Sequence, residues 1–541
     1  MKLILVPTLF AVLALAACDR NATYDPLALA RAQGETIHNP FAVVPSQCYT
    51  KTAGVSNPCW TCHTSKNGSN ALNDAHLQEK YDFSNVGMRN PWSNLFKDRS
   101  AVIANISDSQ ALSYVRQDNF RPLRKALRTH ASYGGLVPDI DLPRGFDADG
   151  FAKDGSEWRA FRYKPFPGTF WPTNGSTDDV MIRLPRFFRT DVEGIENQEI
   201  YKANLAILET ALGVGDNIPD NKIVRSIEPI NEAAIGVDLN GDGAIGGRVD
   251  LIRGLPQRYV GGAAGIGVVR HFYPIGTEFL HSVRYIDPDA PDLLSARLKE
   301  LRYSVKVQWL GKDELTEHYN EERNEPANTP PAFYGSATTG VVSPFGWRLQ
   351  GFIEDAQGRL RLQTREEHQF CMGCHSGLGI TVDQTFGFPR KVPGASGWGH
   401  QSLANIPDVP QAGQTEPETL VYFRRAHGGD EFRANQEVLA RYFPAGKLDI
   451  SKVRAAKDMR DLITPSRERA LALNKAYMAL VREQDFAHGR DAVAQPATNV
   501  HAQIKNDSTG LKKNAAVYKD GRLWLEWPNP AIPSDQIHKA N

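Results

Sequence analysis

The spacing of apolar residues predicts helices in three parts of the chain. In 194–213, apolar side chains recur with the 3.6-residue period of an amphipathic helix, and 107–118 has a shorter stretch of the same spacing. In the carboxyl third, Thr464 is expected to cap a helix that begins at Pro465, since a hydroxyl side chain before proline is typical of a helix start. The apolar faces of the first and last helices are formed by Ile200, Leu205, Ile207, Leu208 and Leu212, and by Leu471, Leu473, Tyr477, Leu480 and Val481.

The middle of the chain has the pattern of β-strands. Residues 281–286 alternate between polar and apolar side chains, and 259–269 and 302–310 are also expected to be strands. By contrast, 19–57 is expected to be an irregular leader and 370–393 to be rich in turns. The segment 134–177 combines Gly, Pro and Asp with many aromatic residues. It is either the wall of a pocket or an elaborate surface loop.

Composition limits the class of protein. Lys plus Arg and Asp plus Glu both number 62, so the formal net charge is zero and nothing indicates a nucleic-acid partner. About 520 residues remain once a signal peptide is removed, which is too many for one compact core. The prediction is a multidomain chain of mixed α and β class. It has a signal peptide at 1–17, a helical and loop-rich region at 18–133, a strand-containing middle region at 134–345, and a second helical region at 346–541.

Two copies of the pattern Cys-x-x-Cys-His carry the clearest chemistry. They are Cys59-Trp60-Thr61-Cys62-His63 and Cys371-Met372-Gly373-Cys374-His375. With 6 Cys and 14 His in 541 residues, roughly 0.002 copies are expected by chance. Two thiols at this spacing can bond the two vinyl groups of one haem, while the adjacent histidine gives the iron a nitrogen ligand.

At these two pentapeptides the chain resembles c-type cytochromes. A zinc site would need four converging ligands, a thioredoxin-like pair would need one Cys-x-x-Cys after a strand, and disulfide partners usually lie farther apart in the chain. The resemblance covers only the pentapeptides and selects no subfamily. It implies two covalently bound haem c groups, held by Cys59 and Cys62 and by Cys371 and Cys374, with His63 and His375 as the proximal iron ligands.

The amino terminus predicts export and lipidation. After Met1-Lys2, an apolar run of 3–17 ends in Leu15-Ala16-Ala17-Cys18, which looks like a bacterial lipobox. The run is shorter than the roughly 20 residues of a transmembrane helix. Cys18 is therefore expected to be the lipidated first residue of a mature protein tethered to a membrane of the cell envelope. An ordinary cleaved signal, with Cys18 incidental, is the alternative. Whether the anchor lies in the inner or the outer membrane stays open.

The remaining candidates concern the distal side of each haem. Cys48 is the one cysteine without an assigned partner, and it lies eleven positions before Cys59, so it is either a thiolate ligand to the first haem or a buried unreactive thiol. Met88 lies downstream of the first motif. His271 and His281 flank a short run beside strand-like sequence, where ligands would be held rigidly, and His281 is slightly preferred. Further candidates are His76, His400 and His427.

A calcium-like loop follows the first long helix. Asp238, Asn240, Asp242 and the carbonyl of Ala244 match the first positions of an EF-hand loop. The twelfth position carries Val249 in place of the usual glutamate, and Asp250 would substitute only if the loop bulged. Bound Ca²⁺ and a turn that binds nothing are both open.

Two classes of function remain open. The first is electron transfer by a lipid-tethered dihaem cytochrome between redox partner proteins, which is the preferred prediction. The second is an oxidoreductase with one catalytic haem, similar to dihaem peroxidases, to haem oxygenases, or to enzymes that act on sulfur compounds. About 270 residues per haem favour some added role, but the separation of the two motifs does not match the dihaem peroxidase pattern.

Overall fold

The computed structural model describes residues 24–51, 63, 75–167, 172–213, 215, 218–324, 329–375, 387–411, 414–426, 435–510 and 525–528. Helices and antiparallel strands are both abundant, which confirms the predicted mixed α and β class. The predicted lipidation residue Cys18 and the first-motif cysteines Cys59 and Cys62 lie outside the described residues, as does His427.

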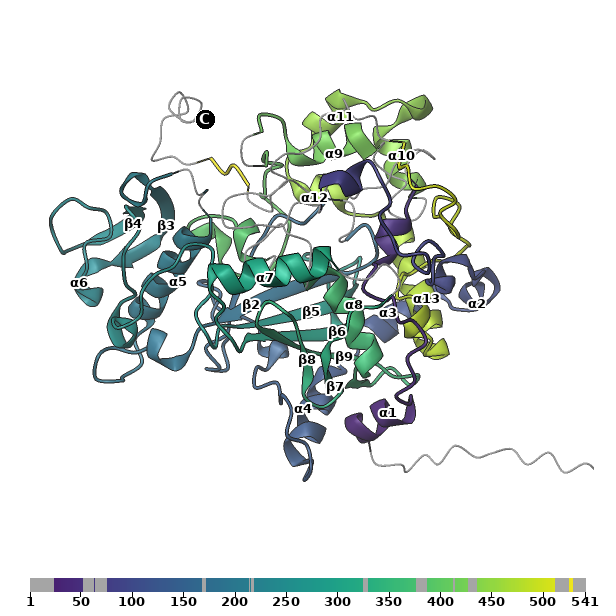
Figure 1. Cartoon of the computed structure of the whole chain (residues 1–541), viewed down its shortest axis with the longest axis horizontal. Helices are drawn as coiled ribbons and strands as arrows, with labels where there is room; N and C mark the ends of the chain where they lie inside the picture. Colours follow the sequence, from purple (N-terminus) through teal and green to yellow (C-terminus); the bar gives the residue numbers. More distant parts are fainter. Residues whose placement is uncertain are drawn as a thin grey trace, which may run out of the picture.

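A central antiparallel sheet organises the described chain (Figure 1). Its strands follow the order β1-β2-β5-β6-β9-β8-β7, and β10 pairs with β9. These strands are β1 (Arg159–Phe161), β2 (Thr177–Arg183), β5 (Glu278–Ile286), β6 (Leu294–Lys306), β7 (Tyr334–Ser336), β8 (Gly340–Val342), β9 (Trp347–Glu354) and β10 (Leu360–Leu362). The sheet therefore takes strands from both sides of the predicted boundary at 345/346. The domain boundaries themselves stay predictions.

A separate two-stranded sheet, β3 (Val224–Asn231) with β4 (Arg248–Arg253), lies beside α5 on the left of Figure 1. In the same view α7 crosses in front of the main sheet, and α9 to α12 gather at the upper right. The α-helices are α1 (Pro26–Ala32), α2 (Ser100–Ala104), α3 (Asp108–Val115), α4 (Phe120–Thr129), α5 (Gln198–Leu212), α6 (Glu232–Ile235), α7 (Lys312–Arg323), α8 (Arg365–His375), α9 (Glu418–Ala426), α10 (Gln436–Tyr442), α11 (Ile450–Arg454), α12 (Met459–Ile463) and α13 (Arg467–Glu483).

The two faces of the main sheet bury different clusters, because successive residues of a strand point to opposite sides. Leu280, Leu301 and Phe352 pack on one face with apolar residues of α1 and α4. Phe279 and Leu349 pack on the other face, in a cluster that also contains residues of α5 and Met372 of α8. This second face is the one that meets the second Cys-x-x-Cys-His motif.

Several predicted elements are confirmed. The helix expected in 194–213 is α5, which Asn197 caps by accepting hydrogen bonds from the Glu199 and Ile200 amides. The shorter helix is α3, which begins with a capping box between Ser107 and Gln110. The strand expected at 281–286 is the second half of β5, and 302–310 overlaps the end of β6.

Other expectations were wrong. Segment 259–269 contains only the short 3-10 turn Gly261–Ala263, because its four glycines favour turns over an extended strand. The last long helix is capped by Ser466, whereas Thr464 caps the carboxyl end of α12. The leader contains α1, and 370–375 belongs to α8 rather than to a turn-rich segment.

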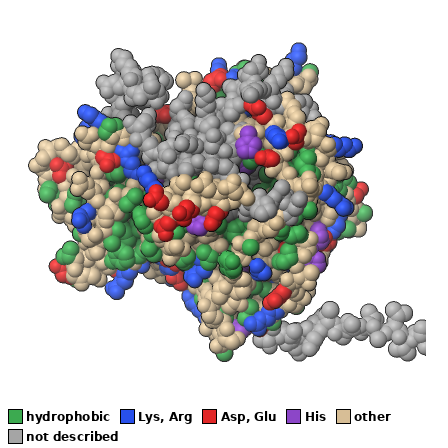
Figure 2. Space-filling view, in the orientation of Figure 1, with side chains coloured by type: hydrophobic (Ala, Val, Ile, Leu, Met, Phe, Trp, Pro, Cys, Tyr) green, Lys and Arg blue, Asp and Glu red, His purple; other side chains and the backbone are tan. Residues whose placement is uncertain are grey.

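Charge is unevenly spread although the whole chain is neutral. Figure 2 shows acidic side chains gathered over α7, where the sequence Lys-Asp-Glu-Leu-Thr-Glu-His-Tyr-Asn-Glu-Glu-Arg supplies five carboxylates. A net charge of zero therefore still leaves local fields on this face of the protein.

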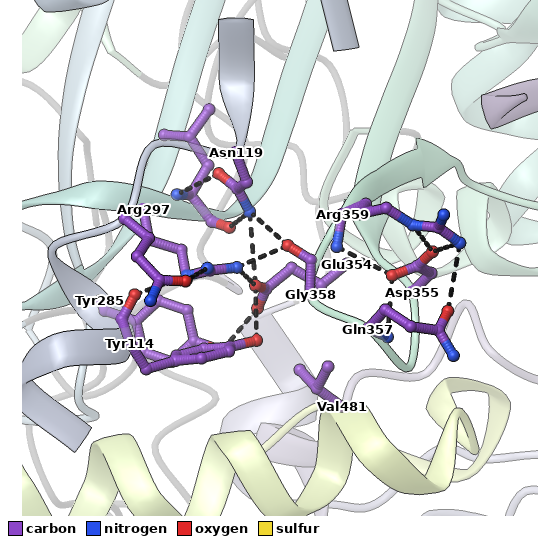
Figure 3. A network of polar contacts seen from close by, with 12 residues as sticks. Tyr114, Asn119, Tyr285, Arg297, Glu354, Asp355, Gln357, Gly358, Arg359 and Val481 are labelled. Carbon is purple, nitrogen blue, oxygen red and sulfur yellow. Dashed lines mark hydrogen bonds and ion pairs between the residues drawn. The ribbon is translucent and has the colours of Figure 1, made fainter. Parts of the chain in front are cut away.

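A buried carboxylate network fixes α3 against the sheet (Figure 3). Glu354, at the end of β9, accepts hydrogen bonds from the hydroxyls of Tyr114 and Tyr285, and Arg297 Nη1 lies 3.0 Å from its Oε1. Burial raises the pKa of Glu354 to about 7, and these donors oppose the rise without cancelling it. The folded protein therefore binds a proton at this carboxyl more tightly than the unfolded chain does.

Glu354 should make stability depend on pH in a defined direction. Its pKa rises from an ordinary 4.5 to about 7 on folding, so its contribution to stability is complete below pH 4.5 and is lost as the pH rises to 7. In Glu354→Gln the decline in the free energy of unfolding between pH 5 and 7.5 should be smaller than in the wild type, as measured by urea unfolding. Glu317→Gln, on the exposed side of α7, serves as the control. Equal declines in wild type and Glu354→Gln would contradict this assignment.

Candidate functional site

The second Cys-x-x-Cys-His motif forms the last turn of α8. The helix starts with reciprocal capping hydrogen bonds between Thr364 and Glu367, in which the Glu367 amide donates to Thr364 Oγ1 (3.1 Å) and the Thr364 amide donates to the Glu367 carboxylate (2.8 Å). Acidic residues occupy its first turn and His375 its last, which suits the helix dipole. Cys371 and Cys374 are three positions apart and therefore lie on the same side of the helix.

Both thiols of this motif are reduced and half-buried. Burial raises the pKa of Cys374 to about 12, and the neighbouring Cys48 and Cys371 add to the rise. Burial also raises the pKa of Cys371, although Arg302 and Arg490 act in the opposite direction. Both groups are therefore neutral thiols at physiological pH, available for a covalent bond. In the described part of the chain, no three His, Cys, Asp or Glu side chains are arranged to hold a metal ion.

The amino-terminal segment packs directly against this motif. A Cβ atom on Gly373 would lie 2.4 Å from the carbonyl oxygen of Val43 and 3.0 Å from Pro45, so only glycine permits this approach. Cys48 follows in the same segment and lies close enough to Cys374 to affect its pKa. The structure thus brings Cys48 to the second motif. How Cys48 lies relative to Cys59 and Cys62 is outside the described residues.

Of the first Cys-x-x-Cys-His motif, the structure describes only His63. The carbonyl of His63 accepts a 2.7 Å hydrogen bond from Gln78 Nε2, and the carbonyl of Gln78 accepts one of 2.8 Å from Thr509 Oγ1. Gln78 is buried. These contacts fix the start of the segment that carries Tyr81 and Phe83.

A row of aromatic rings connects the surroundings of the two motifs. Tyr81 and Phe83 have ring centroids 5.7 Å apart, and Phe83 lies 5.4 Å from Tyr49. Tyr49 is the chain neighbour of Cys48, which lies beside Cys374. Tyr49, Tyr81 and Trp92 belong to one apolar cluster, and Phe370, the chain neighbour of Cys371, packs against it through Trp92.

The predicted distal candidates lie in different environments. Met88 packs at the edge of the cluster that contains Tyr49 and Tyr81. His271 is buried, has a left-handed backbone (φ 64°), and donates its amide hydrogen to the carbonyl of Ala211 at the end of α5. His76 pairs with Asp82 at the surface, whereas the partly exposed His400 pairs with the buried Asp179. The role of each as an iron ligand stays a prediction.

His281 lies at the centre of the main sheet. Its Nε2 is 2.7 Å from Asp178 Oδ2 on the neighbouring strand β2, and the Tyr163 hydroxyl donates to the same oxygen (2.7 Å). A carboxylate in this position orients an imidazole ring and selects its tautomer. On the other side, His281 is the cross-strand partner of Arg302 on β6.

Arg302 belongs to a buried charge cluster next to α8. Its Nε donates to Glu300 (2.8 Å), and Arg490 Nη1 approaches the same carboxylate at 3.2 Å. Arg490 also donates to the carbonyl of Glu367, and Arg361 pairs with the Glu367 carboxylate (2.8 Å). Sequence reasoning missed these arginines and Asp178. No local motif marks them, because they come from β2, β6, β10 and the segment after α13 and meet only in the folded chain.

The calcium-like loop is a tightly hydrogen-bonded turn. The Asp238 carboxylate accepts from the amides of Gly241 and Gly243, and Asp242 accepts from the amide of Ala244 and from Asn240 Nδ2. Asp250 is exposed and held within β4. Its neighbours Val249 and Leu251 pair with Ile230 and Ser226 of β3, so Asp250 lies within the strand, opposite an irregularity in the β3 register. Binding of Ca²⁺ by Asp238, Asn240, Asp242 and Ala244 stays a prediction.

Comparison with known proteins identifies the family. The model of a lipoprotein family matches residues 32–459. The chain belongs to this lipoprotein family. An uncharacterized lipoprotein of Aquifex aeolicus (strain VF5) is 32% identical over 550 residues, covering 88% of this chain and 91% of the relative. No solved structure matches the chain. Among the described residues, none of the helices has the length and apolar character needed to cross a membrane.

Membership in a lipoprotein family agrees with the lipobox-like residues before Cys18 and with a location in the cell envelope. It also accounts for the apolar run that precedes Cys18 without invoking a membrane-spanning helix.

Proposed function

We propose that this lipoprotein is an exported, lipid-anchored dihaem c-type cytochrome that transfers electrons in the bacterial cell envelope. The observation that carries the proposal is the last turn of α8, where Cys371 and Cys374 present two neutral, reduced thiols on one side of a helix and His375 follows at once. This donor set fits covalent attachment of haem better than a thiolate metal site.

In this proposal different residues of the chain attach the haems, bind their irons and anchor the protein to the membrane. Cys371 and Cys374 anchor the second haem, and His375 is its proximal ligand. Cys59, Cys62 and His63 do the same for the first. When bound, each haem supplies an iron that gains and loses one electron. The apolar cluster around Tyr49 and Tyr81 would keep water away from the segment that brings Cys48 to the second attachment site. Lipid on Cys18 keeps the protein at the membrane, near its redox partner proteins.

A second candidate function is an oxidoreductase with one catalytic haem. Its support is the pairing of Asp178 with His281 on the sheet face that meets α8. A carboxylate-oriented imidazole is suited to holding and moving a proton. An electron carrier has no need of such a group next to its cofactor.

Carbon monoxide separates the two functions. Intact mass spectrometry of the purified full-length protein would first count the covalently bound haems, and we expect two. If it is only a carrier, both ferrous haems should keep two protein ligands and refuse carbon monoxide, so the absorption spectrum should not change. If one haem is catalytic, about half of the haem should bind the gas. A mature protein without covalent haem would overturn both functions.

A further inference from the structure

Helix α4 presents a basic face to the solvent. It has no acidic residue and four basic ones, Arg121, Arg124, Lys125 and Arg128. Phe120, Leu123 and Leu127 are buried on another side of the helix. The helix dipole favours a cation only in the last turn, where Arg128 lies, so the dipole does not account for the whole set. The basic face therefore needs another explanation.

Within the described residues, two of these four cations have no carboxylate partner. Arg121 and Arg124 both lie near Asp141, at 3.2 and 3.5 Å. Lys125 and Arg128 are exposed, and neither has an ion-pair partner in the part of the chain that the structure describes. Because they are three positions apart, Lys125 and Arg128 lie on the same side of α4. They form a pair of positive charges that faces the solvent.

Helix α4 lies beside α1, at the lower end of the molecule in Figure 1. His130, the residue that ends α4, has its Nε2 3.2 Å from both carboxylate oxygens of Asp25, which caps the start of α1. Cys18 precedes Asp25 by seven positions, and seven residues span at most about 25 Å. A membrane that holds lipid on Cys18 therefore lies close to the end of α4.

We propose that Lys125 and Arg128 bind the anionic phospholipid headgroups of the membrane in which the protein is anchored. An ammonium and a guanidinium group donate charge-assisted hydrogen bonds to phosphate oxygens. Basic side chains within a Debye length of an anionic membrane are also attracted to its surface. The lipid anchor brings this membrane to α4 in every molecule, which favours lipid over an acidic protein as the partner. The contact orients the protein with α1 and α4 toward the membrane.

Lysine labelling of the full-length lipidated protein tests this contact. The protein is incorporated into vesicles of phosphatidylcholine, with or without added anionic phosphatidylglycerol, and acetylation by a neutral N-hydroxysuccinimide ester is followed by peptide mass spectrometry. Labelling of Lys125 should be about fivefold slower in the anionic vesicles, since each basic residue near such a surface shifts binding by about that factor. In about 1 M NaCl the Debye length is about 3 Å, and the difference should disappear. Lys452, an exposed lysine of α11 at the upper end of Figure 1, should be labelled equally in both vesicles.

Arg128→Gln should bring the labelling of Lys125 in anionic vesicles closer to that in neutral vesicles, because one of the two cations is lost. Arg454→Gln, which replaces an exposed arginine of α11, is the matched control and should leave the difference unchanged. Equal labelling of Lys125 in both vesicles would overturn the proposal and leave the basic face to an acidic protein partner. The proposal is also overturned if Arg454→Gln acts like Arg128→Gln, or if Cys18 carries no lipid. A protein without haem would reject the proposed function and leave this contact standing.

Discussion

Replacing both Cys371 and Cys374 by alanine should leave a protein that retains one covalently bound haem. The double variant keeps His375 but has neither thiol of α8, so no thioether can hold the second haem. Intact mass spectrometry after extraction of non-covalent haem with acidified acetone measures the loss directly, and haem absorbance per mole of protein should fall by about half.

Cys48→Ala is the informative control for this experiment. Cys48 is the neighbour of Cys374 in space, and it contributes to the raised pKa of that thiol, but it belongs to neither pentapeptide. It should therefore keep both covalent haems. A change in its absorption spectrum at full haem content would indicate that Cys48 acts on the distal side of a haem. Two covalent haems in the double variant Cys371→Ala/Cys374→Ala, or the loss of one in Cys48→Ala, would contradict attachment through the pentapeptide.

Elements with strong local signals were predictable from sequence. The spacing of Ile200, Leu205 and Leu208 gives α5, and the alternation after His281 gives β5, because both depend on period alone. The end of α12 shows where prediction from sequence fails. Thr464 and Ser466 are equally good caps in sequence, and only the short helix that stops at Ile463 decides that Thr464 ends one helix and Ser466 begins the next.

In the candidate site, too, only the local features can be found in the sequence. The pentapeptide of the second motif is complete within five residues, so haem attachment can be predicted from it. The partners of the motif come from distant parts of the chain. Cys48 reaches Cys374 across more than 300 positions, and Arg302 meets His281 only because β5 and β6 pair in one register. A shift of one residue would turn Arg302 to the opposite face of the sheet, and nothing local specifies the register.

Replacing Glu418 by alanine should be among the most destabilising single changes in the chain. Glu418 is the first residue of α9 and is fully buried, and its carboxylate binds Lys164 Nζ, both terminal nitrogens of Arg390 (3.0 and 2.6 Å) and Gln411 Nε2 (2.9 Å). Without it, Lys164 keeps the Asp408 carboxylate at 3.1 Å, and Arg390 keeps hydrogen bonds to the carbonyls of Lys164 and Pro165. Removing one partner of a buried ion pair costs about 3–5 kcal/mol.

The same carboxylate should make the fold sensitive to acid. Lys164 and Arg390 overcome the effect of burial and lower the pKa of Glu418 from an ordinary 4.5 to about 2. Its contribution to stability is therefore complete above pH 4.5 and is lost as the pH falls toward 2. Urea unfolding followed by circular dichroism at pH 7 and pH 3.5 should show a smaller difference between Glu418→Ala and the wild type at the lower pH. Glu416 lies two positions before Glu418, and its carboxylate pairs with Arg424 at the surface. Glu416→Ala should therefore lower the free energy of unfolding by only about 0–1 kcal/mol. A Glu418→Ala protein as stable as Glu416→Ala at pH 7 would show that the buried cluster does not hold α9 to Lys164 and Arg390.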